Sequence, residues 1–163
     1  MRLVTALLIS SLIILVSGCV SRITSPDSGP IAKLNVEVVN FVPGSLVNVE
    51  SVYLTLNNAD ESWGGQQILK RKNPAFETDI PANEQVSYVI NLLQGGGGFS
   101  STCGIRFDLT AQENETITTK YELIRANSPV VIGCKADLYI NDKLLGTYQG
   151  GSKVTRYVVE TTY

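Results

Sequence analysis

The sequence contains no histidine, and this absence excludes several kinds of chemistry. Without an imidazole the chain can build neither a Ser-His-Asp triad nor a Cys-His pair, and it can offer no histidine to a metal ion. Carboxylates are present, but no pattern pairs two of them for glycoside hydrolysis or arranges them as a calcium loop. We therefore expect no catalytic site, no metal site and no cofactor.

Charge is also scarce. Charged residues make up 17% of the chain, and the 15 acidic residues outnumber the 13 basic ones. No excess of positive charge is available to hold a phosphate backbone, so we expect no nucleic-acid partner. The chain is nevertheless 44% apolar over 163 residues, which is typical of one folded domain and too apolar for a disordered protein.

The N-terminus has the pattern of an export signal. One basic residue, Arg2, precedes an uncharged and mostly aliphatic stretch of 16 residues, from position 3 to position 18. A helix that spans a bilayer needs about 20 residues, so a cleaved secretory signal peptide is favoured over a permanent anchor.

The end of this stretch, Val16-Ser17-Gly18-Cys19, resembles the lipobox of bacterial lipoproteins. The resemblance covers residues 1–19 and implies three modifications: diacylglycerol on Cys19, cleavage before it, and acylation of the new amino terminus with a chain such as palmitate. Three acyl chains would hold the protein on a leaflet almost irreversibly. Val20 follows the cysteine where inner-membrane lipoproteins commonly have Asp, which favours the outer membrane and its periplasmic face. The alternative is an ordinary signal peptide with an incidental cysteine.

Three segments follow from these boundaries. Residues 1–18 are the expected signal peptide, and residues 19–30 are the lipidated N-terminus with a flexible tether rich in Ser, Pro and Gly. Residues 31–163 form the expected folded domain.

The folded domain alternates apolar and polar residues with a period of two, which is typical of strands with one buried face. The clearest runs lie at positions 34–38, 52–56, 86–92, 103–111 and 134–140, and in each of them we expect every second residue to be buried. Turn signals separate the runs, and Asn141-Asp142-Lys143, between Tyr139-Ile140 and Leu144-Leu145, is the best candidate for a hairpin turn. We expect an all-β fold, an antiparallel β-sandwich of about eight or nine short strands.

Two cysteines remain after Cys19, and both lie on the apolar positions of their runs. In an exported protein this pair, Cys103 and Cys134, predicts one intradomain disulfide. Two buried thiols in a cytosolic protein are the alternative. Their spacing is unlike the Cys-X-X-Cys of redox enzymes.

Two loops could bind a partner. One is the glycine tract, which could present an aromatic side chain and comprises Gly95, Gly96, Gly97, Gly98 and Phe99. The other holds the one tryptophan, in Trp63-Gly64-Gly65. The alternatives are a loose connection between strands and an aromatic cap on the core.

The basic run Lys70-Arg71-Lys72 could contact anionic headgroups or could simply be the solvated end of an edge strand.

These features favour a non-enzymatic lipoprotein that is attached to the bilayer through Cys19 and binds another cell-envelope protein, as an accessory component of, for example, a secretion assembly. The alternative is an envelope inhibitor or immunity protein against a lysozyme or an exported toxin.

Overall fold

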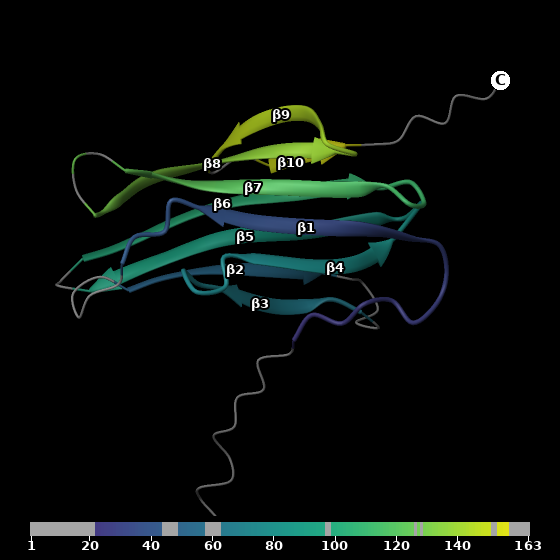
Figure 1. The fold of residues 1–163 in the computed structure, drawn as a ribbon, viewed down its shortest axis with the longest axis horizontal. Coiled ribbons are helices and arrows are strands. Elements are labelled where there is room, and N and C mark those ends of the chain that lie inside the picture. The colour runs from purple at the N-terminus through teal and green to yellow at the C-terminus, as the bar shows by residue number, and fades with distance from the viewer. Residues whose placement is uncertain are drawn as a thin grey trace, which may run out of the picture.

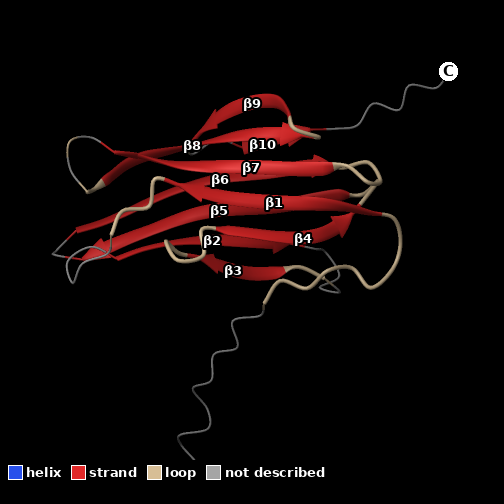
Figure 2. Ribbon diagram, in the orientation of Figure 1, coloured by secondary structure: helices blue, strands red, loops and turns tan. Residues whose placement is uncertain are grey.

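The computed structural model describes residues 22–43, 49–57, 63–96, 99–125, 127, 129–150 and 153–156. These residues form strands, turns and loops, and no helix (Figure 2). The strands are β1 (Ile31–Val39), β2 (Val49–Asn57), β3 (Gly65–Leu69), β4 (Ala75–Pro81), β5 (Gln85–Gly96), β6 (Phe99–Thr110), β7 (Thr116–Arg125), β8 (Val131–Ile140), β9 (Lys143–Gln149) and β10 (Lys153–Arg156). The expected all-β class is confirmed.

The strands form two five-stranded sheets. The first sheet has the order β4-β1-β7-β8-β9 and the second has the order β10-β6-β5-β2-β3. The two sheets overlie one another in Figure 1, with β3 and β4 along one edge of the sandwich and β9 and β10 along the other. We call the first of these edges the β3–β4 edge.

Most neighbouring strands are antiparallel, as expected, but β1 runs parallel to β7 and β10 runs parallel to β6. The alternation of buried and exposed residues is the same for both directions of pairing, so it could not reveal the two parallel pairs.

The core lies between the sheets and contains the alternating residues that the sequence analysis placed there. Leu34, Leu54, Tyr88, Phe107 and Leu138 are all fully buried. The predicted hairpin between β8 and β9 is also present. Ile140 pairs with Lys143, and the two residues between them have positive φ angles (48° and 64°), which suits the tight turns that match the twist of a hairpin.

Polar contacts cross the core and join the sheets. The hydroxyls of Tyr88 on β5 and Thr119 on β7 share a hydrogen bond of 2.7 Å, and the Tyr121 hydroxyl donates to the carbonyl of Cys103 at 2.7 Å. Burial raises the pKa of both tyrosines, although a hydrogen bond opposes the rise in each. Their phenols therefore stay protonated and neutral in the core.

The disulfide between Cys103 and Cys134 joins the sheets covalently, because β6 belongs to the second sheet and β8 to the first. The predicted pairing is confirmed. Cys134 is almost fully buried and Cys103 is partly buried.

The segment before β1 lies against the sandwich. Thr24 and Gly64 exchange backbone hydrogen bonds of 2.9 and 3.0 Å, and Ile23 packs on the core. The hydroxyls of Ser25 and Thr78 are 3.2 Å apart. The expected tether extended to residue 30, but these contacts attach the chain to the sandwich from Ile23 onward.

Candidate functional site

An open groove of about 690 Å³ lies over the outer face of the second sheet. Tyr53, Asn91 and Gly104 are directly paired across β2, β5 and β6 and form its floor. Leu93 and Thr102 pair in the next row, two residues further along β5 and β6. We call this surface the sheet groove.

A glycine, Gly104, occupies an outward position in the middle of β6, on the floor of the groove. A Cβ atom at Gly104 would lie 1.9 Å from Asn91 Oδ1, so the Asn91 amide occupies the space that any larger residue would need. A glycine inside an alternating strand often marks such a close approach. That signal was present in the sequence, but Gly104, Asn91 and Tyr53 were not predicted as a site.

Gly150, which also lines the groove, lies against the disulfide. The Gly150 amide donates to the carbonyl of Cys134 at 2.8 Å. A Cβ at Gly150 would lie 2.2 Å from Cys103 Sγ and 2.9 Å from Cys134 Sγ. The disulfide therefore supports the groove directly as well as joining the sheets.

The lining mixes polar and apolar groups and is uncharged in the described residues, with Leu92 and Cys103 adding apolar surface. It combines the phenol of Tyr53, the amides of Gln66 and Asn91, the hydroxyl of Thr102 and the apolar side chain of Leu93, which is 48% exposed. Amides and hydroxyls both donate and accept hydrogen bonds, and a tyrosine beside an exposed aliphatic residue is typical of protein-binding surfaces. The groove is suited to a neutral polar segment such as a peptide backbone.

A buried polar network holds the end of the sandwich from which the glycine tract projects. Arg125 Nη2 lies 2.8 Å from Glu50 Oε2, with side chains only 13% and 4% exposed. The Gln94 amide donates to Glu50 at 2.8 Å and to the carbonyl of Pro129 at 2.9 Å, and it accepts from the amide of Val131 at 2.8 Å. The network connects β2, β5, β7 and the start of β8. It could not be predicted from the sequence, because its members are far apart in the chain.

The glycine tract is a continuation of the groove strands. Gly95 pairs with Ser100 and Gly96 with Phe99, so part of the expected loop is the end of the hairpin between β5 and β6. Gly97 and Gly98 lie outside the described residues. The tract begins two residues after Leu93 and thus extends the same surface.

The tryptophan loop lies at the opposite end of β2. Trp63 is partly buried and packs against the core. Gly64 has a φ of +100°, and a Cβ there would lie 2.9 Å from the carbonyl oxygen of Leu56, so both its backbone and its close packing require glycine. Gly65 begins β3 opposite Leu56.

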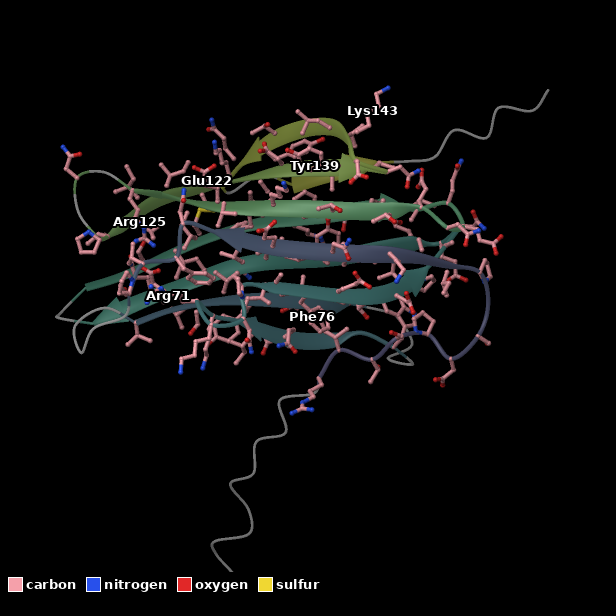
Figure 3. All side chains as sticks on the ribbon, in the orientation of Figure 1. Arg71, Phe76, Glu122, Arg125, Tyr139 and Lys143 are labelled. Atoms are coloured by element: carbon pink, nitrogen blue, oxygen red, sulfur yellow. A yellow bond between two sulfur atoms is a disulfide. The ribbon has the colours of Figure 1, made fainter. Side chains whose placement is uncertain are left out.

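The basic run forms the turn between β3 and β4. Lys70 and Asn73 exchange backbone hydrogen bonds of 3.1 and 2.8 Å, and the side chains of Lys70, Arg71 and Lys72 are exposed. Figure 3 labels Arg71 near this turn, far from Lys143 on the opposite edge.

Cys19 lies outside the described residues. Within the described ranges, no three His, Cys, Asp or Glu side chains are grouped to hold a metal ion, and no helix is long and apolar enough to cross a membrane.

Comparison of the chain with models of protein families, with curated proteins and with solved structures gave no match.

Proposed function

We propose that this protein is a lipoprotein of the bacterial cell envelope, anchored through acylated Cys19, whose β-sandwich binds another envelope protein through the sheet groove. The anchor is supported by the Val16-Ser17-Gly18-Cys19 sequence at the end of an export signal. Val20 after the cysteine favours the outer membrane, with the domain in the periplasm.

The disulfide agrees with this location. Disulfides persist in oxidising compartments such as the periplasm and are rare in the cytosol. The bridge between Cys103 and Cys134 is the one that a chain exported with two inward-facing cysteines would form.

The observation that carries the binding proposal is the sheet groove itself. The groove lies on the outward face of the second sheet, where Gly104 has no side chain and the Asn91 amide packs over it, beside exposed Leu93. Its uncharged lining of amides, a phenol and a hydroxyl favours a polypeptide over an anion or a metal ion. The adjoining glycine hairpin offers further backbone close to the same surface.

A matched pair of variants tests this proposal. Leu93 in the groove and Leu145 on β9 are each 48% exposed, so Leu93→Asp and Leu145→Asp make the same change on two different surfaces. The tagged proteins are crosslinked in cells and purified from detergent extracts. We expect wild type and L145D to recover the same stoichiometric partner and L93D to lose it.

Four results would contradict the proposal, two of them for the groove and two for the anchor. Recovery of no stoichiometric partner by the wild-type protein, or equal recovery by L93D and wild type, would remove the groove as a protein-binding site. A mature N-terminal peptide without lipid in mass spectrometry, or one with the leader still attached, would remove the anchor.

A further inference from the structure

The β3–β4 edge carries the end of the chain that leads to Cys19. Thr24 is bridged to Gly64 immediately before β3, and the described N-terminal segment passes below β3 in Figure 1. The bridge is antiparallel, so the chain from Thr24 back to Arg22 is directed alongside β3 toward the turn that follows it.

The length of the remaining chain limits how far this edge can lie from the bilayer. Cys19 precedes Thr24 by five residues, and an extended chain spans at most about 3.6 Å per residue, so the two are at most about 18 Å apart. Neighbouring strands are spaced about 4.8 Å apart, so the β9 edge lies roughly 19 Å further away, across five strands. A lipid on Cys19 therefore holds the β3–β4 edge closest to the headgroups.

The same edge presents the basic turn. Lys70, Arg71 and Lys72 are consecutive and exposed, and the paired backbone of Lys70 and Asn73 fixes the turn in place. β3 rises about 3.3 Å per residue, so the turn lies about 20 Å along the edge from Gly64. Exposed Arg22 adds a fourth positive charge beside β3.

The acidic residues of β4 interact with Lys33 of β1 and not with the basic turn. Glu77 forms an ion pair of 3.0 Å with Lys33 of β1, and Asp79 also attracts that lysine. The hydrogen bond and charge of Glu77, with a smaller contribution from Asp79, raise the pKa of Lys33. These two carboxylates therefore offset a lysine of the first sheet, while the turn itself contains no acidic residue.

We propose that the β3–β4 edge is the membrane-facing surface of the anchored protein and that Lys70, Arg71 and Lys72 bind the anionic headgroups of the leaflet. This inference rests on the proposed lipid anchor. In this orientation the strands lie along the bilayer plane and the sheet groove faces sideways, open to a periplasmic partner. The β9 edge, where Leu144 and Leu145 are exposed, faces away from the lipid.

Quenching by lipid headgroups tests the orientation. The mature lipidated protein is purified from membranes and placed in phosphatidylcholine vesicles with or without phosphatidylglycerol. A fluorophore is attached to Asn73→Cys beside the basic turn or to Lys143→Cys on the opposite edge. With Cys19 acylated and the other pair oxidised, the added thiol is the one that reacts. Lipids with a spin label on the headgroup then quench fluorophores close to the surface.

We expect strong quenching at position 73 in phosphatidylglycerol vesicles and little quenching at position 143. One basic side chain near an anionic surface strengthens binding about fivefold. Arg71→Glu should therefore reduce quenching at position 73 in phosphatidylglycerol vesicles, toward the value in pure phosphatidylcholine. The matched reversal Lys143→Glu should leave quenching at position 73 unchanged.

The outcomes separate this inference from the proposed function. Equal quenching at positions 73 and 143 of a lipidated protein overturns the membrane-facing edge and leaves the anchor intact. Quenching at position 73 that is independent of phosphatidylglycerol overturns the contact with anionic headgroups. A mass that shows Cys19 without lipid overturns both proposals.

Discussion

Replacement of Gln94 tests the buried polar network that joins the two sheets. Gln94 is completely buried, and its amide bonds to Glu50, Pro129 and Val131 at 2.8 to 2.9 Å. Gln94→Met keeps the length of the side chain but removes the amide. Glu50 and Pro129 each keep a hydrogen bond from Arg125, whereas the buried N–H of Val131 loses its partner.

The expected loss follows from that one N–H group. A buried donor left without a partner costs about 1–3 kcal/mol, so Gln94→Met should lower the free energy of unfolding by about 2 kcal/mol. Gln94→Ala also removes buried volume, and we expect a loss of about 3–4 kcal/mol. Typical domains are stable by only about 5–15 kcal/mol, so either loss is easily measured.

Urea unfolding, followed by the fluorescence of Trp63, provides the measurement. With an m value of about 2 kcal/mol/M, a loss of 2 kcal/mol lowers the urea midpoint by about 1 M. Gln85 is an exposed residue at the other end of the same strand, so Gln85→Met serves as the matched control and should stay within about 0.5 kcal/mol of wild type. Equal midpoints for Q94M, Q85M and wild type would refute the reasoning.

Three further predictions concern the core and the disulfide. Replacing Cys103 and Cys134 by Ala should cost about 3.5 kcal/mol of unfolding free energy, because the pair closes a loop of 31 residues; an unchanged urea midpoint would contradict this. Gly150→Ala should lower the free energy of unfolding by about 1–3 kcal/mol, because the added Cβ would collide with the disulfide. Gly133→Ala should leave it nearly unchanged, because the nearest atom to its added Cβ is 4.0 Å away. Thermal unfolding of both variants checks the difference. Burial raises the pKa of Tyr88, so as the pH rises the phenol ionises in the unfolded chain before it ionises in the folded protein. The contribution of Tyr88 to the free energy of unfolding is therefore complete below about pH 10 and should fall at higher pH by up to about 1.4 kcal/mol per pH unit. Tyr88→Phe should reduce this slope in urea titrations.

Much of the sandwich could be predicted because each strand with a regular alternation carries its own signal. Leu34, Val36 and Val38 are buried as expected, and the inward position of both cysteines predicted their disulfide. β7 lies in the middle of its sheet but was not among the clearest runs, because two of its inward residues are Thr119 and Tyr121. Their hydroxyls are acceptable in the core because each has a hydrogen-bond partner, Tyr88 on β5 for Thr119 and the carbonyl of Cys103 on β6 for Tyr121.

The candidate site was predictable only in part. The glycine tract was identified, but as a loop, because a run of glycines contains no side chain that shows which residues pair across a hairpin. The groove beside it depends on Gly104 meeting Asn91, which comes from the neighbouring strand. The backbone pairing of Thr24 with Gly64 could not be predicted either, because the two residues are far apart in the sequence.

The amino-acid sequence by itself determined the buried face of the regular strands, the turn between β8 and β9 and the inward position of the two cysteines, because each depends on residues close together in the chain or on a short repeat. The export and lipidation signal is likewise a prediction from adjacent residues, Val16-Ser17-Gly18-Cys19. The tertiary structure alone decided the parallel pairing of β1 with β7, the network around Gln94, the sheet groove and the edge that carries both the N-terminal segment and the basic turn. These features join residues separated by dozens of positions, and no local pattern records which distant strand will become a neighbour.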